Sequence, residues 1–165
     1  MDKPLVGIIM GSDSDFSVME EASKILENFK VAHEVLVTSA HRTPERTRKY
    51  VQGAKRRGLR IFIAGAGGAA HLAGVMASLT SLPVIGVPIK SSNSIDGWDS
   101  LLSTVQMPSG IPVATVAINA AKNAGILAAQ IIGSSDENIS KIISTFKENL
   151  ARKVSEDNEL LQKEL

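Results

Sequence analysis

The chain has 165 residues, of which 44% are hydrophobic and 21% charged, so it has the length of one domain and a globular rather than disordered composition. Its 18 basic and 17 acidic residues give a net charge of +1, which argues against nucleic-acid binding through a broad basic surface. Because there is no cysteine, disulfides, thiolate metal sites and a cysteine nucleophile are excluded.

Charge is distributed unevenly along the chain. Residues 1–60 carry 11 basic and 8 acidic side chains, and residues 134–165 carry 5 and 7. The 73 residues between them carry only Lys90, Asp96, Asp99 and Lys122. A buried sheet with small-residue helices would explain this pattern, but the surface of a monomer usually recruits charge. We favour burial of much of this segment between subunits, because interface cores are depleted of charge.

The apolar runs of this chain are short. None of them approaches the roughly 18 residues that a membrane span needs. The run Leu5–Met10 is too short for the apolar region of a signal peptide, and no small-residue cleavage site follows it. We therefore expect a cytoplasmic protein that does not contact the membrane.

Apolar runs and helical spacings alternate in the first part of the chain. Leu5–Met10 predicts a buried strand, and the apolar stripe from Val18 to Phe29 predicts the helix that follows it. A second strand is predicted at Glu34–Val37. Pro44 suits the first turn of a helix that runs to about residue 57, where Gly58 is a plausible stop.

The same alternation continues to residue 132. Further buried strands are predicted at Arg60–Ala64, Val84–Val87 and Val113–Ala117. A short helix and turn are expected over 99–108, and a long apolar helix over 120–132. Strands that are apolar on both faces and alternate with helices indicate a parallel sheet covered on both sides. Right-handed crossovers then favour a three-layer αβα sandwich, an α/β fold.

The character of the chain changes after Gly133. Asp136 and the two serines before it can cap a new helix, and an apolar stripe continues from Ile139 to Val154. This helix, predicted over about 134–160, needs a surface to lie on, either its own sheet or a neighbouring subunit. We interpret residues 1–165 as a single domain, with a core over about 4–132 and a C-terminal helical extension.

Ligands of open parallel sheets bind where the strands end, so the loops after the strands carry the candidate site. The loop after the first strand opens a helix and contains Gly11, Ser12, Asp13, Ser14 and Asp15. Backbone N–H groups and serine hydroxyls there favour an anion, although plain helix capping by Ser14 or Asp15 explains the same residues equally well. Since a carboxylate repels phosphate, we expect an acidic residue here to meet sugar hydroxyls.

The loop after the second strand combines a histidine with an arginine. His41 and Arg42 follow Ser39 and precede Pro44. Arg42 can make paired hydrogen bonds to phosphate, and His41 can carry a proton near neutral pH. His33 lies between a helix and a strand without such neighbours, and we interpret it as structural.

The loop after the third strand, residues 65–70, is rich in glycine and leads to His71. Glycine lets a ligand approach the backbone closely, but the spacing matches neither the dinucleotide fingerprint nor the phosphate-loop pattern. The three histidines have no carboxylate pair at metal-ligand spacing, and no serine lies in a nucleophile elbow. The residues alone therefore favour a small phosphorylated ligand and proton transfer by histidine.

Three stretches of the chain together resemble a known family. Gly11-Ser12-x-Ser14-Asp15, the run Ser39-Ala40-His41-Arg42-Thr43-Pro44 and the stretch from Ala64 to Leu72 are similar to the class I N5-carboxyaminoimidazole ribonucleotide mutases of purine biosynthesis. The similarity continues in order over roughly residues 4–132. It implies a flavodoxin-like fold and a homo-octamer whose sites are formed by more than one subunit. We accordingly place the C-terminal helix on a neighbouring subunit.

The resemblance also implies an activity and roles for residues. The reaction is isomerisation of N5-carboxyaminoimidazole ribonucleotide to 4-carboxyaminoimidazole ribonucleotide in IMP biosynthesis, by decarboxylation and recarboxylation, with no metal, nucleotide cofactor or ATP. His41 would be the catalytic proton shuttle, His71 would support the site, and residues 90–98 would form part of a lid. The residues expected to bind substrate are Ser12, Ser14, Asp15, Ser39, Ala40, Arg42, Gly67, Ala70, His71 and Leu72.

Two alternatives stay open. A class II relative would carboxylate aminoimidazole ribonucleotide directly with CO2, but the continuation Arg42-Thr43-Pro44 favours class I. A non-catalytic, flavodoxin-like ligand-binding module would not need His41. The chain also has Ala73 where the family usually has proline.

Overall fold

Within residues 3–165, which the computed structural model describes, five parallel strands form one sheet in the order β2-β1-β3-β4-β5. Met1 and Asp2, which the predicted domain includes, lie outside the described residues. The strand order reverses between β1 and β3, so this point of the sheet is the expected ligand position. The strands are β1 (Val6–Met10), β2 (His33–Val37), β3 (Ile61–Gly67), β4 (Val84–Ile89) and β5 (Ala114–Thr115).

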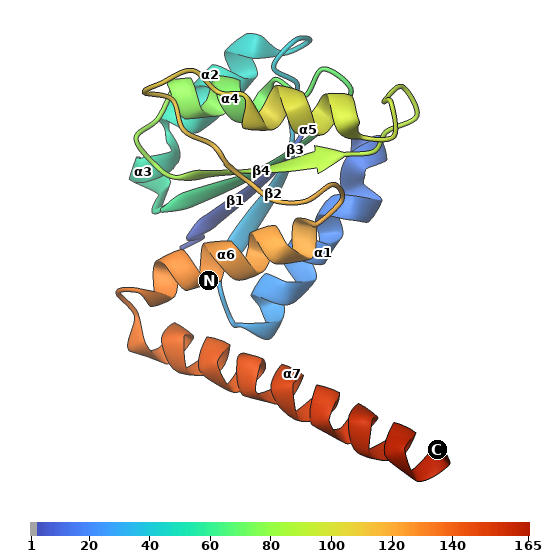
Figure 1. The fold of residues 1–165 in the computed structure, drawn as a ribbon. Helices are drawn as coiled ribbons and strands as arrows, with labels where there is room; N and C mark the ends of the chain where they lie inside the picture. Colours follow the sequence, from blue (N-terminus) through green and yellow to red (C-terminus); the bar gives the residue numbers. More distant parts are fainter. Residues whose placement is uncertain (1–2) are drawn as a thin grey trace.

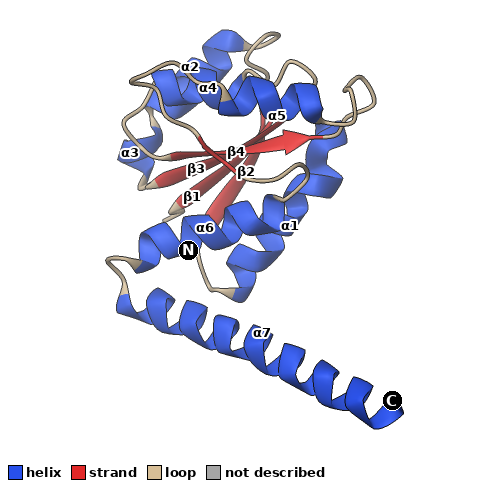
Figure 2. Ribbon diagram, viewed as in Figure 1, coloured by secondary structure: helices blue, strands red, loops and turns tan. Residues whose placement is uncertain are grey.

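Helices cover both faces of this sheet, which confirms the predicted three-layer αβα arrangement (Figures 1 and 2). Among the described residues, none of the helices has the length and apolar character needed to cross a bilayer. The helices are η1 (Asp13–Asp15), α1 (Phe16–Asn28), α2 (Pro44–Gln52), α3 (Ala54–Arg57), α4 (Leu72–Ser78), α5 (Trp98–Val105), α6 (Ala121–Gly133) and α7 (Glu137–Glu164).

The two faces of the sheet contribute to two separate hydrophobic clusters. Alternate residues of β1 divide between them: Ile8 packs in the cluster with α1 and α6, and Ile9 in the cluster with α4. In β3, Ile63 and Phe62 divide in the same way. Because neighbouring side chains of a strand point to opposite faces, a strand buried on both faces is apolar throughout. The continuous apolar runs in the sequence have this cause.

Three element boundaries differ from the predictions. The helix expected over 44–57 is divided at Gly53 into α2 and α3, because glycine has low helix propensity. Strand β3 extends to Gly67, so half of the expected glycine loop is strand. Strand β5 has two residues instead of the five predicted. After it, the Val116 N–H donates to the Gly86 carbonyl and the Asn119 N–H to the Pro88 carbonyl, so three residues advance here against two in β4 and the regular ladder ends. Helix α4 was not predicted.

Helix α7 begins as the sequence indicates and continues further. Asp136 caps it by accepting the N–H groups of Asn138 and Ile139 at 3.0 and 3.2 Å. Near its start α7 packs on its own chain, where the ring of Phe146 meets Phe29 edge-on with centroids 5.2 Å apart. From residue 147 onward every residue is exposed, and the helix projects away from the sheet (Figure 1). A neighbouring subunit against this outer part stays a prediction.

Candidate functional site

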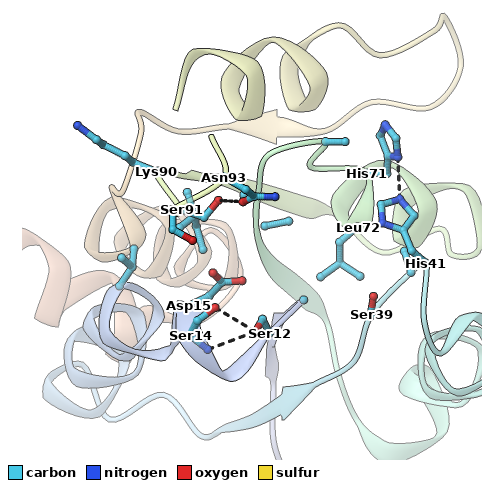
Figure 3. A pocket seen from close by; sticks show the side chains of 18 of the residues that line it. Ser12, Ser14, Asp15, Ser39, His41, His71, Leu72, Lys90, Ser91 and Asn93 are labelled. Carbon is cyan, nitrogen blue, oxygen red and sulfur yellow. Dashed lines mark hydrogen bonds between the residues drawn. The ribbon is translucent and has the colours of Figure 1, made fainter. Parts of the chain in front are cut away.

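A cavity of about 660 Å³ opens at the carboxyl ends of β1, β2, β3 and β4, around the point where the strand order reverses (Figure 3). Its volume is in the range of small-molecule sites, which measure about 300 to 1,000 Å³. The loops after four different strands therefore contribute to one site. The predicted site residues that line it are Ser12, Ser14, Asp15, Ser39, Ala40, His41, Arg42, Gly67, His71 and Leu72.

Ala70 is the predicted site residue that does not line the cavity. Its side chain is 2% exposed, and its backbone N–H donates to the hydroxyl of Ser103 at 3.1 Å. The structure thus places Ala70 behind the cavity wall, in the turn between β3 and α4.

The loop after β1 is held by a small network of hydroxyl groups. The Oγ of Ser14 donates to the Oγ of Ser12 at 2.9 Å, and the Ser14 N–H donates to Asp13 at 3.0 Å. Ser12 caps η1, whereas Asp15 makes no side-chain cap for α1. Helix capping therefore explains the presence of Ser12, but it does not explain that of Asp15.

Asp15 is a nearly buried carboxylate in the cavity wall, 5% exposed. Burial raises its pKa above the ordinary value of 3.8, and the charge of Asp13 acts in the same direction. Hydrogen bonds from Ser12 and Ser14 and the charge of Arg42 oppose this rise. A carboxylate that is costly to bury gains from a ligand that donates hydrogen bonds, such as a sugar hydroxyl pair.

Arg42 connects the loops after β1 and β2. Its guanidinium Nη2 donates to the Gly11 carbonyl at 3.1 Å, and its backbone N–H donates to the Ser39 hydroxyl at 3.1 Å. The guanidinium thus lies beside the loop that carries Ser12. A cation and hydroxyl donors at one end of the cavity form a suitable environment for phosphate.

His41 and His71 form a pair on the opposite side of the cavity from Asp15 (Figure 3). The Nε2 of His41 lies 2.8 Å from the Nδ1 of His71, and the two rings are perpendicular with centroids 4.9 Å apart. At this distance one nitrogen must donate and the other accept, so the pair holds one proton between its facing nitrogens. Such a pair can store a proton and return it to a ligand.

Three threonines, which sequence reasoning missed, support the loop of His41. The buried hydroxyl of Thr38 bonds to the hydroxyls of Thr43 and Thr47 at 3.1 and 3.0 Å. The hydroxyl of Thr43 also accepts the N–H of Ser39 at 3.0 Å. Threonines before and within a proline-started helix are the only sequence signal of this support.

The loop after β4 forms a wall that was anticipated only as part of a lid. The hydroxyl of Ser91 donates to Asn93 at 2.6 Å, and Lys90 pairs with Asp96 at 2.7 Å. A Cβ on Gly67 would overlap the Ser91 hydroxyl, so the loop packs closely on the end of β3. The glycine at this position makes that close approach possible.

The remaining histidine lies outside the cavity. The Nδ1 of His33 is 3.0 Å from the Val31 carbonyl, and its Nε2 is 2.6 Å from the Ser23 hydroxyl. Both ring nitrogens therefore have protein partners, in agreement with the structural role predicted. Within residues 3–165 no three His, Cys, Asp or Glu side chains gather as metal ligands would.

The sequence of this chain matches a known family over most of its length. Residues 5–153 match the AIR carboxylase family. This chain belongs to the AIR carboxylase family. The match confirms the family expected from the three motifs. Helix α4 begins at Leu72, with Ala73 in its first turn.

Individual relatives agree with this membership. N5-carboxyaminoimidazole ribonucleotide mutase of Pyrococcus horikoshii is 58% identical over 161 residues, which cover 98% of this chain and 90% of that protein. The mutase of the same name from Thermotoga maritima is 56% identical over 159 residues, covering 96% and 92%. The crystal structure of Treponema denticola PurE superimposes with a TM-score of 0.85 at 31% identity, covering 96% of this chain and 98% of that one. The flavodoxin-like fold is thereby confirmed.

Proposed function

We propose that this chain is an isomerase that converts N5-carboxyaminoimidazole ribonucleotide to 4-carboxyaminoimidazole ribonucleotide in purine biosynthesis. The similarity to mutases of that name over nearly the whole chain supports the reaction. The observation that carries the chemistry is the pair of His41 and His71 at the cavity, with their facing nitrogens 2.8 Å apart.

The substrate is proposed to lie along the cavity with its phosphate at the loops after β1 and β2. Ser12, Ser14 and Arg42 would donate to the phosphate, because their hydroxyl and guanidinium groups gather at that end. Asp15 would accept from the ribose hydroxyls. The base and carboxylate would then lie between the backbone of residues 67–72 and Ser39, within reach of His41.

In the proposed mechanism, His41 moves one proton between two atoms of the substrate. As the carbamate N–C bond breaks and CO2 leaves, His41 protonates the exocyclic nitrogen. The ring carbon then bonds to the retained CO2, and His41 removes the proton from that carbon. His41 recovers from the ring carbon the proton that it gave to the nitrogen, and the CO2 is retained in the product, so we expect no metal, redox cofactor or ATP to be required. His71 would accept a hydrogen bond from protonated His41 and steady it.

The assay that tests this function offers purified protein each possible substrate separately. N5-carboxyaminoimidazole ribonucleotide should be converted without added bicarbonate. Aminoimidazole ribonucleotide with low bicarbonate should give little product, because free CO2 is scarce. Efficient turnover of the second mixture would assign the chain as a carboxylase that uses CO2 directly.

The role of His41 has its own test. His41→Asn should reduce turnover to background while the ribonucleotide still binds, because asparagine hydrogen-bonds but does not carry a proton near neutral pH. His33→Asn is the matched control, since His33 is bonded to Val31 and Ser23 away from the cavity. Full turnover by His41→Asn would refute the proton-shuttle role and favour a different base or a non-catalytic ligand-binding function.

We further propose that the chain assembles as a homo-octamer, with sites completed by neighbouring subunits. Helix α5 exposes an apolar stripe at helical spacing, with Trp98, Leu102 and Val105 exposed to 60%, 54% and 51%. On α7, Leu150 and Val154 are exposed to 51% and 69%. Such stripes on a chain whose middle is poor in charge mark association surfaces.

Light scattering tests the assembly. The mass in solution should be eight times that of the 17.5 kDa chain. Leu102→Glu should lower this mass, whereas Lys141→Glu, on the exposed side of α7, should not. A stable monomer of the parent chain would refute the proposal. We place the assembled enzyme in the cytoplasm, with residues 4–132 as one mutase domain and α7 as its extension onto a neighbour.

A further inference from the structure

The hydroxyl of Ser103, on α5, joins its own helix to the turn that follows β3. Its Oγ donates to the Asp99 carbonyl at 2.8 Å, with the Ser100 carbonyl at 3.2 Å. Because a hydroxyl has one proton, this bond leaves its lone pairs free to accept. The N–H of Ala70 donates to that oxygen at 3.1 Å. Ser103 is not one of the residues that line the cavity.

The turn held by this bond leads directly to the histidine pair. Gly68 has φ +61°, and Ala70 is 2% exposed, so the Ala70 N–H has no ready access to water. His71 follows at once, donates its N–H to the Ala69 carbonyl at 2.9 Å and is the N-cap residue of α4. Ala70, which contacts Ser103, is thus the direct neighbour of His71, whose Nδ1 contacts His41.

Helix α5 is itself anchored to the sheet beside this turn. The buried hydroxyl of Ser100 donates to the carbonyl of Ile89, the last residue of β4, at 2.8 Å. Ser103 and Ser100 therefore connect one helix to the turn after β3 and to the end of β4, two neighbouring strands of the sheet. A fixed helix is a better reference point for a catalytic group than a free loop.

We propose that Ser103 is a positioning residue for the reaction, because its oxygen sets the turn that places the ring of His71 against His41. This inference rests on the proposed mutase function. Without the hydroxyl, the Ala70 N–H is buried without a partner, and the turn must rotate to satisfy it. The His71 ring then leaves its contact with His41, and proton transfer slows although the ribonucleotide-binding residues stay in place.

The test compares Ser103→Ala with Ser103→Thr, which keeps the hydroxyl. Ser144→Ala is the matched control, since Ser144 bonds to the carbonyl four residues earlier in α7, at 3.1 Å, and is exposed. Ser103→Ala should lower kcat by about 10- to 100-fold, the range expected when a catalytic group is misplaced by about 1 Å. KM should stay near the parental value and the pH profile of kcat should shift. Ser103→Thr and Ser144→Ala should keep the parental kcat and pH profile.

Two further measurements separate positioning from simple destabilisation. Hydrogen exchange of a peptide spanning residues 64–72 should accelerate in Ser103→Ala but not in Ser144→Ala. If Ser103→Ala does not fold, Ser103→Cys fills the same space with a weaker acceptor and should give an intermediate loss of kcat. A folded Ser103→Ala or Ser103→Cys with parental kcat and pH profile would overturn the inference.

The positioning role can also be tested without turnover. In protein with 15N-labelled histidine, the ring-nitrogen chemical shifts of His41 and His71, which report their mutual hydrogen bond, should change at a fixed pH in Ser103→Ala, while those of His33 should not. Unchanged ring-nitrogen shifts of the pair would refute the positioning role even if the parent is an active mutase. Absence of mutase turnover in the parent, with these shifts altered as expected, would instead refute the proposed function alone.

Discussion

Gly67 and Ser91 are closely packed at the end of β3 beside the cavity, and Gly67→Ala tests this contact. A Cβ at Gly67 would overlap the Ser91 hydroxyl and lie 2.5 Å from the Ser91 Cβ and 3.0 Å from the Ile89 carbonyl oxygen. Gly67 belongs to strand β3 and does not have the positive φ that excludes alanine. The obstacle is therefore steric, and the mobile partner is the loop that carries Ser91.

The size of the effect follows from which atoms must move. Overpacking a well-packed position costs about 1 to 3 kcal/mol. Because the closest atoms belong to Ser91, which lies in a surface loop and not in the packed core, we expect the lower end, about 1 kcal/mol. For a chain of this size, that lowers Tm by about 2 to 4 °C. The displaced loop also changes the shape of the cavity, so ribonucleotide affinity should fall by about 10-fold, equivalent to roughly 1.4 kcal/mol.

The assay pairs thermal unfolding with ribonucleotide binding in single and double variants. Ser91→Gly removes the side chain in the way, so Gly67→Ala with Ser91→Gly should recover most of the lost Tm and affinity. Gly11→Ala is the control for stability, because a Cβ on this other cavity glycine meets nothing within 4 Å. Parental Tm and affinity in Gly67→Ala, or no recovery in the double variant, would refute the reasoning.

Three other predictions follow from single interactions. Asp15→Asn should raise Tm at pH 7.5 and weaken ribonucleotide binding about 10-fold. The raised pKa of Asp15 means that its ionised form costs stability; this cost is absent below about pH 3.8 and grows as pH rises through the raised pKa. A Tm gain that does not shrink as the pH is lowered from 7.5 towards 3.8 would contradict this prediction. Phe146→Ala removes the edge contact with Phe29 and should lower the free energy of unfolding, measured in guanidinium, by about 2 to 3 kcal/mol. Thr145→Ala, at an exposed neighbouring position, should not lower it. Equal losses in the two variants would count against packing of α7 on its own chain. Burial and the hydrogen bond to Glu34 raise the pKa of Tyr50, the only tyrosine of the chain, far above 10.0. Tyrosinate absorbance at pH 10.5 should therefore be absent from the folded protein and present in guanidinium, and the stability of the fold should decrease as pH rises above 10. Tyrosinate absorbance that appears near pH 10 in the folded protein would contradict this prediction.

Much of the fold could be predicted from the sequence because its signals are local. Apolar runs gave the positions of the strands, Pro44 the start of α2, and Asp136 the cap of α7. His41 and Arg42 were predicted as site residues because they follow a strand, and parallel strands present their carboxyl ends at one edge of the sheet. Both residues line the cavity. These inferences need only periodicity, capping chemistry and the handedness of crossovers.

Tertiary structure decided which of those strand-end residues meet. His41 and His71 are 30 positions apart, and their 2.8 Å contact depends on the register of β1 between β2 and β3 and on a turn held by Ser103. The same holds for Ser91 against Gly67, where two strand ends bring together residues whose types alone carry no sign of contact. Local periodicity specifies each element and the face it buries, but a distance between two loops is set by strand order, register and packing. The sequence by itself therefore determined the three layers and the edge of the sheet at which the candidate site lies. Only the folded chain decided that His41 and His71 meet in that site.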